Sequence, residues 1–253
     1  MNALTPSGTQ PDVAGLPRER IPTSHGPAEV RVVRPAPAGT SSGVASPARG
    51  TLLVGHGAGG QRDTPDVLAL TDLAQEGWTV VLVDQPWRVA GRRIATPAPT
   101  LDRAWLDIVA VLAEQDHTPD GSPLPRPWVY AGRSAGARVA CRTSTMTSTR
   151  SGSGVAAVVA LSFPLHPPDR PEKTRAPELR VPLDAGLPTL VVQGASDPMG
   201  TPAQIEQAVD DPPTGLLTLL TVPGSHSPTR DVDAVRRHVR DFLDRAVPHP
   251  QRC

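Results

Sequence analysis

The sequence predicts a three-layer α/β domain, in which a mostly parallel central sheet carries helices on both faces. Two observations lead to this prediction. Short runs of consecutive apolar residues recur along the chain, and strands that are buried on both faces of a parallel sheet have this composition. Stretches with apolar residues at helical spacing separate these runs, so strand and helix alternate, as in right-handed crossover units.

Seven segments are expected to be strands, because each is short, rich in β-branched or other apolar residues, and bounded by turn-forming or polar residues. In chain order they cover residues 30–33, 51–54, 79–83, 128–131, 155–161, 189–192 and 216–222. The last six are apolar at both alternate sets of positions, so we expect them to be buried on both faces of the sheet.

Helices are expected between these strands, because apolar residues recur there at spacings of three and four. They cover residues 64–77, 100–114 and 230–247, with two shorter helices that begin after residue 134 and at residue 201. Segment 164–186 contains six prolines and is expected to be irregular, since proline interrupts helices. Residues 1–28 and 248–253 are expected to be tails around a single domain over 29–247, without a large cap.

Composition excludes several classes of function. The 25 basic residues of the 253-residue chain balance 25 acidic ones, so no basic excess indicates nucleic acid or anionic lipid as a partner. No apolar run approaches a membrane span, and the N-terminus lacks the pattern of a secretory signal, so we expect a soluble cytoplasmic protein. The two cysteines, Cys141 and Cys253, are too few for a disulfide framework or a four-cysteine zinc site. No metal or cofactor motif is present, and none is expected to be needed.

Residues 132–136, Gly-Arg-Ser-Ala-Gly, match the G-x-S-x-G pattern of a nucleophile elbow. In such an elbow a sharp turn between a strand and a helix exposes the serine Oγ. The pentapeptide alone is equally consistent with a chance match of small residues. Its position between a predicted strand and a predicted helix favours Ser134 as a nucleophile.

A serine nucleophile requires a histidine base and an acid, which follow later strands in α/β hydrolytic sites. Asp197 follows the strand predicted at 189–192, and His226 follows the one at 216–222. Taken alone, Asp197 is more simply explained as an aspartate in a turn, and His226 as a histidine in a surface loop. Their order, and their positions after the carboxyl ends of strands, favour a Ser134–Asp197–His226 triad.

The sequence Gly-His-Gly-Ala-Gly-Gly at 55–60 follows the strand predicted at 51–54. Acyl transfer requires backbone N–H donors that point at the developing oxyanion, and a glycine-rich turn lets the backbone approach a substrate closely. We expect Gly57 or Ala58 to supply one donor and Ala135, directly after the nucleophile, to supply the other. A phosphate-binding loop is the alternative, but no Walker lysine follows the glycines.

Together, the motifs at 55–60, 132–136, 194–198 and 224–226 resemble the α/β-hydrolase superfamily. Phe-Pro-Leu-His-Pro-Pro at 163–168 and Pro-Glu-Lys at 171–173 are similar to its dienelactone-hydrolase-like branch, which includes testis-expressed hydrolase-like proteins and a subunit of a chromatin acetyltransferase complex. The resemblance covers about residues 29–247 and implies an α/β-hydrolase fold with a hydrolytic site of undefined substrate. Dienelactone hydrolases carry a cysteine nucleophile, so Ser134 argues against that particular reaction.

Two further residues are candidates for substrate binding. Arg133, inside the elbow, is expected either to contact substrate or to pair with a local carboxylate. His166 lies in the proline-rich segment. Three roles are open for it: it lines the pocket, it packs in the core, or it faces solvent. Cys141, in the helix after the nucleophile, is expected to be a small core residue.

We expect a serine hydrolase that cleaves an ester, thioester or related acyl bond of a small molecule. No nucleic-acid or membrane partner is expected, and the sequence leaves open a homo-oligomer or a protein partner. A non-catalytic scaffold that keeps the fold is the first rival. Acyl transfer to an acceptor other than water is the second.

Overall fold

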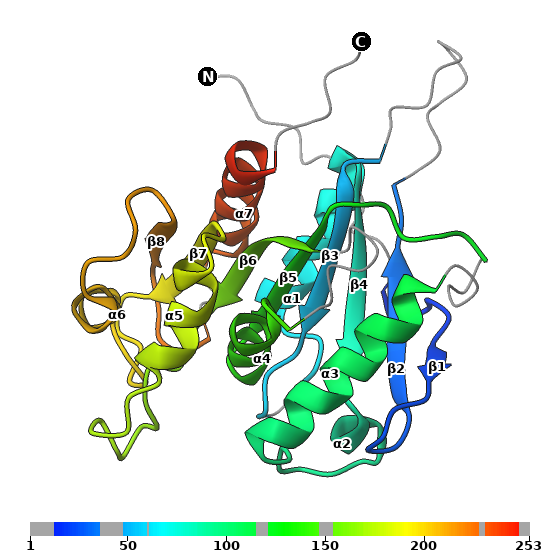
Figure 1. The fold of residues 1–253 in the computed structure, drawn as a ribbon, viewed down its shortest axis with the longest axis horizontal. Helices are drawn as coiled ribbons and strands as arrows, with labels where there is room; N and C mark the ends of the chain where they lie inside the picture. Colours follow the sequence, from blue (N-terminus) through cyan, green and yellow to red (C-terminus); the bar gives the residue numbers. More distant parts are fainter. Residues whose placement is uncertain are drawn as a thin grey trace.

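The computed structural model of the chain describes residues 13–35, 48–59, 61–114, 121–146, 154–227 and 231–247. Its centre is an eight-stranded sheet with the spatial order β1-β2-β4-β3-β5-β6-β7-β8 (Figure 1). The strands are β1 (Glu19–Ile21), β2 (Ala28–Val33), β3 (Gly50–Gly55), β4 (Trp78–Asp84), β5 (Trp128–Arg133), β6 (Val155–Leu161), β7 (Thr189–Gly194) and β8 (Leu217–Val222).

All neighbouring strands from β4 to β8 are parallel, and only β1 and β2 join the sheet antiparallel. Parallel strands end at the same edge of a sheet, so the loops that follow β3, β5, β7 and β8 gather there. The register aligns Gly55 with Gly132, and Gly194 with Val222. These four residues lie at the carboxyl ends of the strands that precede the predicted site residues.

Helices cover both faces of the sheet. They are α1 (Pro65–Ala69), a 3₁₀ helix η1 (Leu70–Glu76), α2 (Pro86–Val89), α3 (Ala98–Ala113), α4 (Ala135–Thr143), α5 (Ala176–Asp184), α6 (Pro202–Val209) and α7 (Val232–Ala246). The helices α3, α4 and α5 pack on one face, and α1, η1 and α7 on the other (Figure 1). The predicted three-layer α/β fold is confirmed, and in the described part of the chain these layers carry no additional cap domain.

The prediction of a tail over residues 1–28 is wrong for its last part. Strand β1 pairs with β2, which itself starts at Ala28, and the side chains of Ile21 and Ala28 are buried. An edge strand of three residues is too short for its alternation to stand out in the sequence, which explains the error. Residues 1–12 and the predicted tail at 248–253 lie outside the described residues.

Two other expectations also need correction. Strand β8 was expected to be buried on both faces, but most of its residues are half-exposed because it is the edge strand beyond β7. Segment 164–186 was expected to be irregular, but its last part forms α5. Pro177 is accommodated there in the first turn, where no intrahelical N–H bond is lost, and Pro182 packs in the core beside Leu183.

None of the helices in the described part of the chain is long and apolar enough to cross a membrane.

Candidate active site

The nucleophile elbow has the local structure that its sequence predicted. Ser134 lies between the end of β5 and the start of α4, with φ 53° and ψ −110°. Positive φ is costly for a residue with a side chain, so the surrounding structure must hold it. One restraint is the Ser134 N–H, which donates to the carbonyl oxygen of Leu161 on β6 at 2.9 Å.

The glycines on either side of Ser134 allow β3, β5 and α4 to approach one another closely. A Cβ atom on Gly132 would lie 2.4 Å from the carbonyl carbon of Gly136. One on Gly136 would lie 2.3 Å from the carbonyl oxygen of Gly55. Both contacts are with backbone, which has little freedom to move away, so the packing at the elbow requires glycine at both positions.

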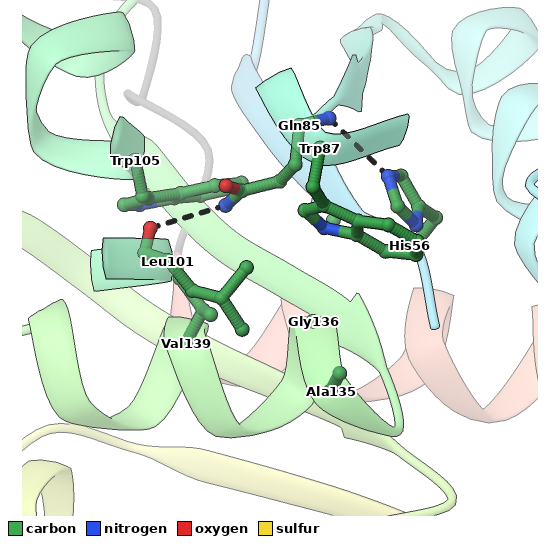
Figure 2. A pocket seen from close by; sticks show the side chains of 9 residues that line it. His56, Gln85, Trp87, Leu101, Trp105, Ala135, Gly136 and Val139 are labelled. Carbon is green, nitrogen blue, oxygen red and sulfur yellow. Dashed lines mark hydrogen bonds between the residues drawn. The ribbon is translucent and has the colours of Figure 1, made fainter. Parts of the chain in front are cut away.

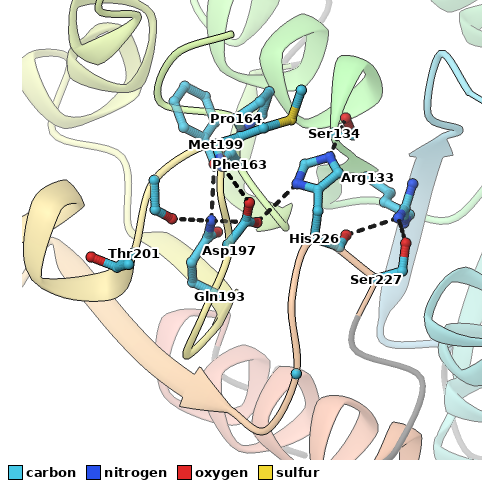
Figure 3. Close-up of polar contacts among 12 residues, drawn as sticks. Arg133, Ser134, Phe163, Pro164, Gln193, Asp197, Met199, Thr201, His226 and Ser227 are labelled. Carbon is cyan, nitrogen blue, oxygen red and sulfur yellow. Dashed lines mark hydrogen bonds and ion pairs between the residues drawn. The ribbon is translucent and has the colours of Figure 1, made fainter. Parts of the chain in front are cut away.

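Three predicted residues come together at the carboxyl end of the sheet (Figure 3). The His226 Nε2 atom lies 2.8 Å from Ser134 Oγ, and the Nδ1 atom lies 2.8 Å from Asp197 Oδ2. A carboxylate only accepts hydrogen bonds, so Nδ1 carries the proton and Nε2 accepts from the serine hydroxyl. Nucleophile, base and orienting acid therefore have the geometry of a catalytic triad.

The carboxylate of Asp197 is fixed by donors from its own loop and from β7. Asp197 is 1 % exposed, its Oδ2 accepts from Gln193 Nε2 at 2.8 Å, and its Oδ1 accepts from the Met199 N–H at 2.8 Å. Gln193 Nε2 also donates to the carbonyl oxygen of Gly200 at 2.7 Å. Sequence reasoning missed Gln193, although an amide side chain at the end of an apolar strand is a signal of a buried polar partner.

Arg133 holds the loop that carries the catalytic histidine. Its side chain is 7 % exposed, and its Nε donates at 3.1 Å to Oδ2 of Asp66, whose side chain is 1 % exposed. Its Nη2 donates to the carbonyl oxygen of His226 at 2.8 Å and to Ser227 Oγ (Figure 3). Of the two expectations for Arg133, these contacts match pairing with a carboxylate. Asp66 was not identified from the sequence.

The glycine loop lies against the nucleophile. A Cβ atom on Gly57 would be 3.5 Å from Ser134 Cβ, so this part of the loop directly borders the serine. His56 Nδ1 donates to the carbonyl oxygen of Gly57 at 2.8 Å, and His56 Nε2 accepts from the Gln85 N–H at 3.2 Å. Burial lowers the pKa of His56, which keeps the imidazole neutral and able to make both bonds.

The oxyanion donors Gly57, Ala58 and Ala135 remain predictions, although Gly57 and Ala135 both adjoin Ser134. Gly60, the last residue of the motif, lies outside the described residues. A narrow pocket of about 10 Å³ borders Ala135 on the side of α3 (Figure 2). Its walls are largely apolar, formed among others by Trp87, Leu101 and Trp105, and it has room for about one water-sized group.

The structure does not bring His166 into the triad. It is 7 % exposed, and its Nδ1 donates to the carbonyl oxygen of Pro167 at 2.9 Å. Its backbone N–H donates to the carbonyl oxygen of Met199 at 3.0 Å, which ties the proline-rich segment to the Asp197 loop. A substrate contact by His166 remains a prediction. Cys141 is fully buried, as expected, and burial raises the pKa of its thiol.

Within the described ranges, no group of three or more His, Cys, Asp or Glu side chains could hold a metal ion.

Comparison with known families decides the assignment that the geometry suggests. The family model of the alpha/beta hydrolase domain matches residues 48–242, a range that includes all three triad residues. The chain belongs to the alpha/beta hydrolase domain family. This membership confirms the predicted superfamily, whereas the finer resemblance to testis-expressed hydrolase-like proteins remains a prediction. Comparison with curated proteins gives no match.

Solved structures of other proteins share the fold of this family member. An α/β serine hydrolase without lid from Xanthomonas campestris is 19 % identical, with a TM-score of 0.66 over 99 % of this chain and 100 % of that one. A dienelactone hydrolase from Anabaena variabilis is 21 % identical, with a TM-score of 0.64 over 92 % and 98 %. Est1E from Butyrivibrio proteoclasticus is 14 % identical, with a TM-score of 0.65 over 91 % and 98 %. The similarity to the Anabaena structure agrees with the predicted dienelactone-hydrolase-like fold.

Proposed function

We propose that this protein is a serine hydrolase, which cleaves an ester, thioester or related acyl bond of a small molecule through an acyl-enzyme on Ser134. The observation that carries the proposal is the continuous hydrogen-bonded chain from Ser134 Oγ through His226 to the buried Asp197. The proposed setting is the cytoplasm, with no nucleic-acid or membrane partner, as the composition suggests.

In the first half-reaction Ser134 Oγ attacks the carbonyl carbon of the substrate while His226 Nε2 takes the hydroxyl proton. The carbonyl oxygen becomes an oxyanion, which the N–H of Ala135 and one N–H of the Gly57–Ala58 turn are proposed to bind. When the tetrahedral intermediate collapses, the bond to the leaving group breaks and Nε2 returns the proton to it. The product of this step is the acyl-enzyme.

In the second half-reaction water attacks the acyl carbon, and His226 Nε2 takes a proton from that water. Collapse of the second intermediate breaks the bond to Ser134 Oγ, which recovers its proton from the imidazole. Asp197 stays ionised throughout and stabilises the imidazolium that forms in each half-reaction.

A non-catalytic scaffold is the main alternative, since fold alone does not dictate function. The strained φ of Ser134 argues against it. A strained serine that is hydrogen-bonded to His226, which the buried Asp197 orients, stabilises nothing that a scaffold needs.

Active-site labelling with a fluorophosphonate, together with hydrolysis of p-nitrophenyl esters, tests the proposal. The probe forms a phosphorus–oxygen bond to an activated serine and releases fluoride. We expect labelling of the wild type and turnover of short-chain esters, both reduced at least about 1,000-fold in Ser134→Ala. Product analysis in the presence of added alcohols would separate hydrolysis from acyl transfer.

Ser144→Ala is the matched control. Ser144 directly follows helix α4, which Ser134 directly precedes; it is buried, and its hydroxyl donates to the carbonyl oxygen of Cys141 at 2.8 Å. We expect this variant to be labelled like the wild type. If folded wild-type protein were not labelled, the scaffold alternative would replace the hydrolase.

A further inference from the structure

A second hollow, of about 470 Å³, lies beside the glycine loop and is lined mainly by arginines. Its size is within the usual range for sites that bind small molecules. Four of its seven lining residues are Arg62, Arg88, Arg92 and Arg93. The mechanism proposed above uses none of them.

The acidic side chains nearest these arginines are already engaged. Asp63 is the one acidic residue in the lining, and both of its carboxylate oxygens accept from Arg31, which lies outside the lining and has a side chain only 2 % exposed. Asp84 accepts from Arg62 at 2.6 Å, and its side chain is 3 % exposed. Both carboxylates are thus neutralised by partners around them.

Arg92 and Arg93 form no ion pair or side-chain hydrogen bond with any of the residues that the structure describes. The hollow therefore has a local positive excess, although the whole chain has a formal net charge of zero. Such an excess raises the local concentration of small anions.

The backbone that presents these arginines is an ordered turn. Helix α2 is continued by hydrogen bonds from the Gly91 N–H to the Arg88 carbonyl oxygen and from the Arg92 N–H to the Trp87 carbonyl oxygen, both 3.0 Å. Gly91 has a φ of 71°, which a glycine adopts without strain and which reverses the chain after the helix. The Arg88 guanidinium lies 5.3 Å from the centroid of the Trp87 ring.

The chain on both sides of the hollow leads back to the candidate active site. Trp87, which directly precedes the lining residue Arg88, packs on His56 with ring centroids 5.3 Å apart, and the Gln85 N–H donates to His56 Nε2 (Figure 2). Arg62, on the other wall, follows Gly57 by five residues, which span at most about 18 Å. Gly57 borders Ser134, so the stretch of chain that leads to Arg62 starts beside the nucleophile.

We propose that this arginine hollow binds an anionic group, a phosphate or a carboxylate, of the acyl substrate that Ser134 cleaves. The inference rests on the proposed hydrolase function and narrows its substrate class. Guanidinium groups suit this role, because their paired N–H donors match the oxygens of carboxylate and phosphate.

Two esters with the same six-carbon acyl chain test the proposal: 4-nitrophenyl hexanoate and the mono-4-nitrophenyl ester of adipic acid, which adds a terminal carboxylate. We expect wild-type kcat/KM to be at least about 10-fold higher for the adipate ester, and this ratio to fall as salt rises. In Arg92→Ala/Arg93→Ala the ratio should fall to about one. The charge-matched control Arg236→Ala/Arg237→Ala, on α7, should keep the wild-type ratio.

A binding measurement gives a readout that does not depend on catalysis. Calorimetric titration with inorganic phosphate at low salt should show binding that is at least about 10-fold weaker in Arg92→Ala/Arg93→Ala and unchanged in the α7 control. Phosphate should also compete with the adipate ester. Phosphate that binds without competing would mean that the hollow holds a free anion, and this result would overturn the substrate role.

The two proposals fail in different ways. Equal kcat/KM values for the two esters, with normal fluorophosphonate labelling of Ser134, would overturn the anion site and leave the hydrolase intact. Arginine-dependent phosphate binding by a protein that the fluorophosphonate does not label would overturn the hydrolase, and with it the assignment of the anion to an acyl substrate.

Discussion

At the scale of single residues, Arg133 joins helix α1, the nucleophile and the histidine loop. It is adjacent to Ser134 in sequence, pairs with the buried Asp66 and donates to the carbonyl oxygen of His226. The imidazole ring is already oriented by Asp197, but the position of its backbone depends on this guanidinium. Arg133 is therefore a positioning residue, and its loss should affect the chemical step more than substrate affinity.

We expect Arg133→Met to lower kcat about 10- to 100-fold with little change in KM, and to reduce stability by about 3 kcal/mol, because Asp66 is left buried without its partner. Arg133→Lys should recover part of kcat. The double variant Arg133→Met/Asp66→Asn removes the uncompensated charge, so it should regain stability while kcat stays low. Steady-state kinetics and urea unfolding measure both quantities.

Arg138→Met is the matched control for a lost ion pair, because Arg138 pairs with Glu178 on α5 and does not contact His226. It should reduce stability without a selective loss of kcat. Recovery of kcat in the Arg133→Met/Asp66→Asn variant would refute the positioning role and reduce Arg133 to a structural ion pair.

The residues of the triad could be predicted from sequence because each lies in the segment that follows an apolar strand, and their order along the chain is fixed by the fold. The partners of Arg133 could not, because Asp66 and His226 lie 67 and 93 positions away, and no local pattern records which charges meet. Gln193 is intermediate: its place directly after a predicted buried strand was visible, but its acceptor on Asp197 was not.

At the scale of elements, the close packing of β3 against α4 fixes the elbow, and it requires Gly136. We expect Gly136→Ala to lower the free energy of unfolding by about 1–3 kcal/mol and to reduce activity, because the added Cβ would displace the backbone of Gly55. Gly59→Ala is the control, since a Cβ there would have no neighbour within 4 Å among the residues that the structure describes. Its effect on urea unfolding should stay within about 0.5 kcal/mol. Equal stability of the two variants would contradict the packing argument.

The sequence pattern predicted elements with long apolar runs and missed those shaped by tertiary contacts. Strands such as β6, with seven consecutive apolar residues, were identified directly. The short α2 and β1 carry too few residues for a period to appear. Helix α5 contains two prolines, and it forms because its buried leucines pack on the core and because Arg138 and Arg142 from α4 bind its Glu178.

At the scale of the whole molecule, the site is built from segments that the sheet alone brings together. The glycine loop, the nucleophile, the acid and the histidine follow β3, β5, β7 and β8, which occupy the middle and one edge of the sheet. The residues of the arginine hollow also follow carboxyl ends of strands: some come after β3, and the others lie in α2 or just after it, beyond β4. Catalysis and substrate selection would thus reside on loops, while the parallel strands supply the rigid frame.

The half-exposed edge strand β8 makes the candidate active site more sensitive to heat than the rest of the fold. His226 depends on this edge strand, which hydrogen-bonds to only one neighbour and is expected to fray first on warming. All four tryptophans lie in the other part of the fold, on β4, α2, α3 and β5: Trp78, Trp87, Trp105 and Trp128. Ester turnover should therefore be lost a few degrees below the midpoint of the fluorescence transition. Coincident midpoints would instead mean that the edge and the tryptophan-rich half unfold as one cooperative unit.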